Sequence, residues 1–217
     1  METSHRRGRF ACKVRSACAA FVLLLPAPAP ADPVPAAEVV ERLHAALLDA
    51  MQRADELGYP GRREVLAPVL AASFDFAFMS RLALGSEWRK LDEAQRERWI
   101  STFRELSLAT YAARFDGFSG ESFATDATEP AARDTTLVKT RLVRVNDEPV
   151  PLNYRLRRDG ESWRIIDIYL NGTVSEVALR RSEYAAVLER SGFEALVAEL
   201  ETKIGSYANG AMPASSG

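Results

Sequence analysis

Two neighbouring segments, "PVPLNYRLRR" at residues 149–158 and "SWRIIDIYLNGT" at residues 162–173, decide the fold. Both are rich in β-branched and aromatic residues, and the "DGE" between them is typical of a hairpin turn. In the second segment both alternating sets of positions are apolar, so both faces of the strand would be apolar. The residues expected on one face are Ile166, Ile168 and Leu170, and those expected on the other are Trp163, Ile165 and Tyr169. Such a strand is expected to be central and covered on both sides.

Further strands and helices surround this hairpin. "TTLVKTRLVRV" (residues 135–145) and the turn "NDE" predict a third strand, and "SFATDATEP" (residues 122–130) predicts an edge strand. Helical spacing precedes the sheet at residues 36–58, 62–72, 74–84 and 92–115. Capping-box pairs predict the start of the last of these helices at Asp92 and of two C-terminal helices at Thr173 and Ser191. The order predicts an α+β fold with helices packed on a curved antiparallel sheet. We expect this fold to be cone-shaped and NTF2-like and to enclose an apolar cavity.

The N-terminus has the pattern of a secretory signal peptide. A basic leader precedes an apolar run at residues 17–25 and the small residues "APAPA". The run is shorter than the roughly 20 residues that span a bilayer. We therefore expect four parts: a signal peptide at 1–31, a linker and N-terminal helix at 32–60, an α+β domain at 61–205 and a disordered tail at 206–217.

Composition argues against several classes of function. Cys12 and Cys18 both lie in the expected signal peptide, so the exported chain would have no thiol. Its only histidine would be His44, expected at a surface or an interface, and no metal-ligand cluster or cofactor motif is visible. Without residues 1–31 the chain keeps 23 basic and 29 acidic side chains, a net charge of −6, which disfavours nucleic-acid binding.

Asp167 is the sharpest candidate for catalysis, because it is one acid in an otherwise apolar strand. Burial would raise its pKa and suit a general base, with Tyr154 as a donor on the neighbouring strand. This predicts, as an alternative, an enzyme of a cone-shaped, NTF2-like fold. The favoured interpretation is structural: Asp167 accepts hydrogen bonds from the backbone or from an arginine such as Arg141 or Arg155 and orders the sheet.

The large apolar content favours a cavity over a catalytic centre. The predicted helix at 92–115 is apolar over about half its circumference, wider than the usual stripe of a surface helix. It either lies between two layers or turns one flank toward a hollow. Burying a methylene is worth ~0.8 kcal/mol, so hiding two long acyl chains from water corresponds to roughly 25 kcal/mol. A deep apolar cavity would supply that.

Several motifs in order carry a resemblance to a known family. They are "LG" and "WR" at Leu84–Gly85 and Trp88–Arg89, the tyrosine Tyr111, "YRL" at 154–156, "WRIID" at 163–167 and "RSEY" at 181–184. Together, over about residues 62–204, they resemble the MlaC family, the toluene-tolerance type periplasmic phospholipid shuttles, and its hopanoid-associated relative HpnM. Asn171 before Gly172, where phospholipid carriers often have an acid, favours the hopanoid-associated branch.

The resemblance implies a monomeric periplasmic carrier that moves a hopanoid or a glycerophospholipid between the two membranes and serves outer-membrane lipid asymmetry. It also implies an inner-membrane transporter partner, of the MCE/ABC or the RND type, and an outer-membrane lipoprotein. The residues expected to line the cavity are Phe103, Leu106, Tyr111, Leu142, Tyr154, Leu156, Ile166, Ile168 and Leu170. Each has an ordinary core interpretation beside the cavity one.

Overall fold

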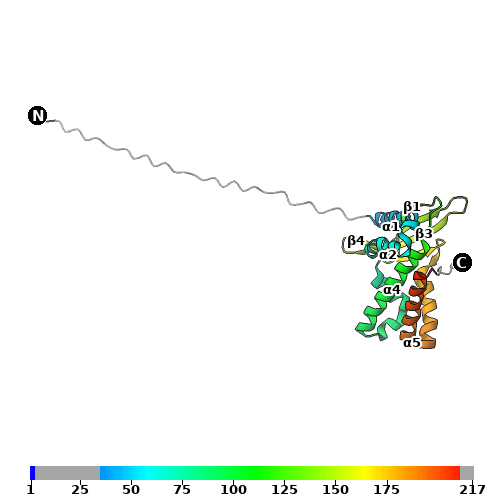
Figure 1. The fold of residues 1–217 in the computed structure, drawn as a ribbon. Coiled ribbons are helices and arrows are strands. Elements are labelled where there is room, and N and C mark those ends of the chain that lie inside the picture. The colour runs from blue at the N-terminus through cyan, green and yellow to red at the C-terminus, as the bar shows by residue number, and fades with distance from the viewer. Residues whose placement is uncertain (3–34, 211–217) are drawn as a thin grey trace. The chain divides into compact units, whose positions relative to one another are not determined.

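The structure is a computed structural model that describes residues 1, 2 and 35–210 (Figure 1). The predicted signal peptide, apart from its first two residues, lies outside these residues, as do residues 32–34 of the linker and the end of the predicted tail at 211–217. Contacts divide the chain into residues 1–32 and 33–217, and the fold below is that of the second unit. None of the helices in its described part is long and apolar enough to cross a membrane.

Helices α1 (Ala36–Gln52) and α2 (Ala54–Ser73) open the fold and pack on each other. The predicted break at Gly58 is a kink inside α2, where Gly58 has φ 56°, a conformation that glycine adopts without strain. The chain also breaks earlier than predicted, at Arg53, so one predicted helix is two elements.

Helix α3 (Phe76–Leu84) and a 3₁₀ turn η1 (Gly85–Lys90) lead into the long helix α4 (Glu93–Arg114). The predicted capping box at the start of α4 is confirmed. The Asp92 carboxylate accepts from the Gln95 amide nitrogen at 2.8 Å, and the Gln95 side chain accepts from the Asp92 amide nitrogen at 3.1 Å. Because the backbone N–H groups of Asp92 and Gln95, which have no partner within the helix, are both hydrogen-bonded, the start of α4 is firmly defined.

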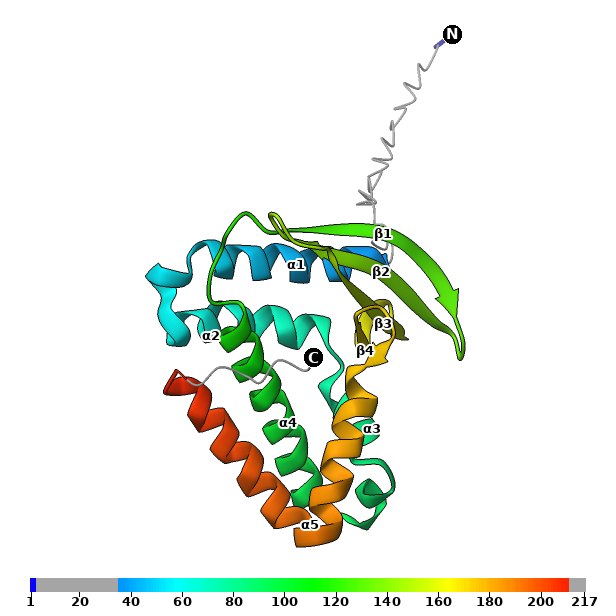
Figure 2. The same ribbon diagram turned by 90° about the vertical axis from the view of Figure 1, so that its right-hand side faces the viewer.

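The sheet has five antiparallel strands in sequence order, which confirms the α+β class. They are β1 (Ser122–Ala131), β2 (Thr135–Val143), β3 (Val150–Asp159), β4 (Ser162–Leu170) and the short β5 (Val174–Ser175). The register shifts once between β1 and β2 and once between β3 and β4, and such bulges bend and twist a sheet. Figure 2 shows β1 and β2 curving over α1.

The prediction of which β4 side chains share a face is wrong for the N-terminal half of the strand. Leu156 pairs with Ile165, whereas Arg155 pairs with Asp167, so Ile166 is an extra residue between two pairs. A bulge of one residue reverses which side chains face inward beyond it. Ile165 therefore shares the inner face with Ile168 and Leu170, and Ile166 does not continue their alternation.

Helix α5 (Glu176–Ala208) completes the domain and packs along α4 (Figure 2). Its N-cap is Ser175, whose hydroxyl accepts from the Ala178 amide nitrogen at 3.0 Å, and not the predicted Thr173. The two predicted C-terminal helices are present as the two halves of α5, which meet at a kink at Gly192, with φ 79°. The predicted disorder from residue 206 is wrong up to Ala208, because the helix continues and Tyr207 is only 4% exposed.

Candidate functional site

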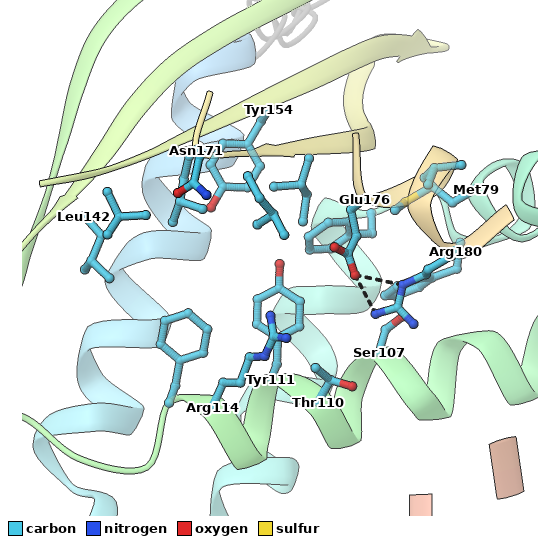
Figure 3. Close-up of a pocket in the computed structure, with 18 of the residues that line it drawn as sticks. Met79, Ser107, Thr110, Tyr111, Arg114, Leu142, Tyr154, Asn171, Glu176 and Arg180 are labelled. Atoms are coloured by element: carbon cyan, nitrogen blue, oxygen red, sulfur yellow. Dashed lines mark hydrogen bonds and ion pairs between the residues drawn. The ribbon is translucent and has the colours of Figure 1, made fainter. Parts of the chain in front are cut away.

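A cavity of about 540 Å³ lies between α4, the inner face of the sheet and the first turns of α3 and α5 (Figure 3). Its volume is in the range of sites that bind small molecules. Most of its walls are aliphatic and aromatic, with a few charged groups. Among the described residues no group of three or more histidines, cysteines or carboxylates is placed to hold a metal ion.

Helix α4 gives the cavity one long wall. The side chains are spaced three or four residues apart, which puts them on one helix face over about 18 Å: Phe103, Ser107, Thr110, Tyr111, Arg114 and Phe115. The Ser107 hydroxyl donates to the Phe103 carbonyl at 2.8 Å, and the Thr110 hydroxyl donates to the Leu106 carbonyl at 2.7 Å. Because both hydroxyls donate within the helix, neither has a donor hydrogen left for a ligand.

The sheet provides the opposite wall through residues that are paired across strands. Leu142 faces Val150, Leu152 faces Leu170, and Tyr154 faces Ile168, and all six line the cavity. Directly paired residues of an antiparallel sheet lie on the same face. Three adjacent strands thus present one continuous apolar surface toward α4.

Aromatic rings and a methionine close one end of the cavity. Phe74 lies 5.4 Å from Phe76 and Phe76 lies 6.5 Å from Phe103, measured between ring centroids. Met79 lies in the same part of the wall (Figure 3). This end is formed by the junction of α2 and α3 against the middle of α4.

Charged groups occupy defined places in the wall. Arg180 and Glu176, one turn apart on α5, form an ion pair at 2.8 Å, and Arg180 also donates to the Tyr184 hydroxyl at 3.2 Å. Arg114 at the end of α4, Arg144 after β2 and Asn171 after β4 also line the cavity. Arg144 pairs with Asp147 at 2.7 Å, but among the described residues its buried Nε has no hydrogen-bond partner.

Of the two places expected for His44, a surface or an interface, the surface is wrong, because His44 lies between α1 and the sheet. His44 is only 4% exposed, stacks on Phe123 at 4.0 Å between ring centroids, and lies with Nε2 3.1 Å from the Tyr154 hydroxyl oxygen. Burial lowers the pKa of His44 to about 4, and it raises the pKa of Tyr154 above its ordinary value. Both side chains are therefore neutral near pH 7, and the pair holds α1 against β3.

Asp167 and Tyr154 do not form an acid–base pair. Asp167 pairs with Arg155, while Tyr154 pairs with Ile168, so the two side chains lie on opposite faces. Asp167 accepts from the Ser175 hydroxyl at 2.6 Å and from the amide nitrogens of Ile168 and Val177 at 2.9 and 3.2 Å. Burial raises the pKa of Asp167, and these hydrogen bonds oppose that shift. The carboxylate holds the start of α5 to β4.

The structure brings six of the nine predicted wall residues to the cavity: Phe103, Tyr111, Leu142, Tyr154, Ile168 and Leu170. Leu106, Leu156 and Ile166 are buried but do not line it. Leu106 is three residues from Phe103, but it lies on the edge of α4 away from the cavity, at about 100° per residue. Leu156 faces inward but lies beyond the cavity, paired with Ile165, and Ile166 is displaced by the bulge.

The sequence interpretation missed the polar and charged lining residues. Ser107, Thr110 and Arg114 follow Phe103 at i+4, i+7 and i+11, so the helical period would have found them once Phe103 was chosen. Glu176 and Arg180 had no such signal, because their place depends on how α5 leaves the sheet. The bulge that displaces Ile166 has no sequence mark at all.

Comparison with known proteins gives two findings. The family model described as "MlaC protein" matches residues 41–202, more than half of the chain. The fold is similar to a solved structure of a phospholipid-binding protein from Ralstonia solanacearum in complex with a phospholipid. That match has a TM-score of 0.70 and 21% sequence identity, and covers 81% of this chain and 99% of the other.

Proposed function

Because the chain belongs to the MlaC family, we propose that it is a periplasmic lipid carrier that holds the acyl chains of a glycerophospholipid in the cavity between α4 and the sheet. The observation that carries this proposal is the apolar cavity itself. It lies between two continuous walls, and the hydroxyls of Ser107 and Thr110 are already bonded within α4. The phospholipid bound by the similar solved structure supports the same class of ligand.

Energetics fit a carrier that loads from a membrane. Each methylene moved from water into the cavity gains ~0.8 kcal/mol, so a lipid released directly into water would pay a steep cost. Moving from a bilayer to the cavity exchanges one apolar environment for another, so this transfer is close to thermoneutral. The direction of transport is then set by the partners and not by the carrier.

We further propose that the charged lining residues bind the lipid headgroup. Arg114 and Arg144 line the cavity together with Asn171, and guanidinium groups bind phosphate oxygens through paired hydrogen bonds. Hopanoid is the second candidate, favoured by Asn171, whose amide suits a hydroxylated headgroup without phosphate.

Location and partners complete the proposal. Residues 1–31 direct export, and the mature monomer exchanges lipid with an inner-membrane transporter, of the MCE/ABC or the RND type, and with an outer-membrane lipoprotein. It acts as a carrier and not as an enzyme, which the separation of Asp167 from Tyr154 supports.

Mass spectrometry of the natively purified protein tests the proposal. We expect one glycerophospholipid per chain, released on denaturation and restored by incubation with phospholipid vesicles. A stoichiometric hopanoid instead would favour the second candidate. A protein that carries no lipid and takes up none from vesicles would rule out the carrier function.

A further inference from the structure

Phe76, the first residue of α3, contacts two separate hollows. On one side it closes the aromatic end of the main cavity. On the other it lines a smaller groove of about 270 Å³ between α2 and α4, half the volume of the main cavity. We call this second hollow the side groove; its other lining residues are Ala67, Leu70, Ala71, Arg104, Glu105 and Leu108.

The side groove suits hydrocarbon better than a headgroup. Ala67, Leu70 and Leu108 supply an apolar floor, and the two charged residues, Arg104 and Glu105, are engaged with other charges. Glu105 pairs with Arg63 of α2 at 2.7 Å and with Arg104 at 3.8 Å. The Arg63–Glu105 pair joins α2 to α4 beside the groove, whose remaining lining residues are apolar.

The backbone beside Phe76 is fixed by hydrogen bonds, while its ring is held only by packing against Phe74 and Phe103. Asp75 donates its amide hydrogen to the Ile165 carbonyl at 2.9 Å, and its carboxylate accepts from the Phe78 amide nitrogen at 2.9 Å and from Arg157 Nε at 2.8 Å. The phenyl ring forms no hydrogen bond that would have to break for it to turn. With a hollow on either side, the ring has space to move while α3 stays in place.

We propose that the Phe76 ring is a movable partition, and that its rotation joins the main cavity to the side groove so that part of an acyl chain enters between α2 and α4. This inference rests on the proposed carrier function and makes Phe76 a determinant of tail length and number. The main cavity runs along about 18 Å of α4. A lipid with two long tails needs further apolar volume, and the side groove is adjacent to the end where the tails would lie.

Two kinds of variant separate this idea from simple damage to the fold. Ala67→Phe fills the side groove from α2, and Ala72→Phe, an exposed position on the same helix outside the groove, is its matched control. Phe76→Leu thins the partition and Phe76→Trp thickens it. Circular dichroism and thermal melting verify the fold of each variant.

The readout is binding from vesicles of phosphatidylglycerol with short or long tails, with single-chain lysophosphatidylglycerol as the reference. We expect Ala67→Phe to weaken long-tail binding about tenfold, as loss of about two buried methylenes would. Lysolipid binding and the Ala72→Phe control should be unchanged. Phe76→Leu should shift the preference toward long tails and Phe76→Trp toward short ones.

The outcomes keep the two proposals apart. A wild-type protein that binds none of these lipids would overturn the carrier function itself. A wild-type protein that binds them, with Ala67→Phe and both Phe76 variants leaving the chain-length preference unchanged, would overturn the partition while the carrier function stands.

Discussion

The Nε2 atom of His44 lies 3.1 Å from the hydroxyl oxygen of Tyr154, so a buried histidine of α1 is bonded to a tyrosine that lines the cavity. The bond joins residues 110 positions apart in the chain. Because the imidazole also stacks on Phe123 of β1, one side chain connects α1 to two strands of the sheet. The protonation of His44 therefore affects how the first helix is attached.

Stability should fall as the pH is lowered through the range in which His44 titrates. Burial lowers the pKa of His44 to about 4 in the folded protein, whereas the unfolded chain takes up its proton near the ordinary value of 6.5. Between these two pKa values the unfolded state therefore binds more protons than the folded state. The contribution of His44 to the free energy of unfolding drops by about 2 kcal/mol from pH 7 to pH 5. Urea unfolding at pH 7 and pH 5 measures this drop in the free energy of unfolding. An equal pH dependence in His44→Phe would contradict this assignment.

Asp167→Asn should weaken the fold without altering the choice of ligand. The amide group places a donor where the carboxylate accepts from Ser175 or from the amides of Ile168 and Val177. We expect a loss of about 1–3 kcal/mol in the free energy of unfolding, since a buried donor then loses its acceptor. Asp159→Asn, at the exposed end of β3, is the control. Wild-type stability in Asp167→Asn would show that the carboxylate does not anchor α5.

Filling the cavity from α4 should block lipid uptake. Ser107 lines the cavity, and Ser107→Phe adds a ring to the space proposed for acyl chains. Ser101→Phe, on an exposed position of the same helix, adds the same ring outside the cavity. We expect Ser107→Phe to lower binding of phospholipid from vesicles by about tenfold or more. If both variants bind as well as the wild type, the tails lie elsewhere.

Removing the cations of the cavity wall should affect lipids according to their headgroup. Arg114→Gln and Arg144→Gln each remove a guanidinium group proposed to bind the lipid phosphate. We expect each to weaken phosphatidylglycerol binding about tenfold, the strength of one charge-assisted contact, while diacylglycerol binding stays constant. Arg190→Gln, exposed on α5, is the control. An equal loss for both lipids would mean that the arginines act on the fold.

Local signals in the sequence predicted most of the elements. The capping box at Asp92, the helix break at Gly58 and the hairpin at residues 149–173 each depend on residues close together in the chain. The end of α5 was harder to see, because the small polar residues after Gly205 obscure Tyr207, whose burial depends on distant partners.

The site was predictable only as far as strand and helix periodicity reach. Phe103 and Tyr111 share one face of α4, and Tyr154 and Ile168 share one face of the sheet, so simple periods found them. Ile166 was misplaced because a bulge interrupts the period of two. His44 was misplaced because one polar residue on an amphipathic helix looks exposed until its partner, Tyr154, is known.

The central claim is that lipid tails lie between α4 and the sheet, and photo-crosslinking with a phosphatidylglycerol that carries a diazirine near the end of one acyl chain tests it most directly. After irradiation and digestion, mass spectrometry should find the label on lining residues of the cavity, such as Phe103, Tyr111, Leu152 or Ile168. Labels confined to outer surfaces, or no label on a protein that still binds the lipid, would contradict the account.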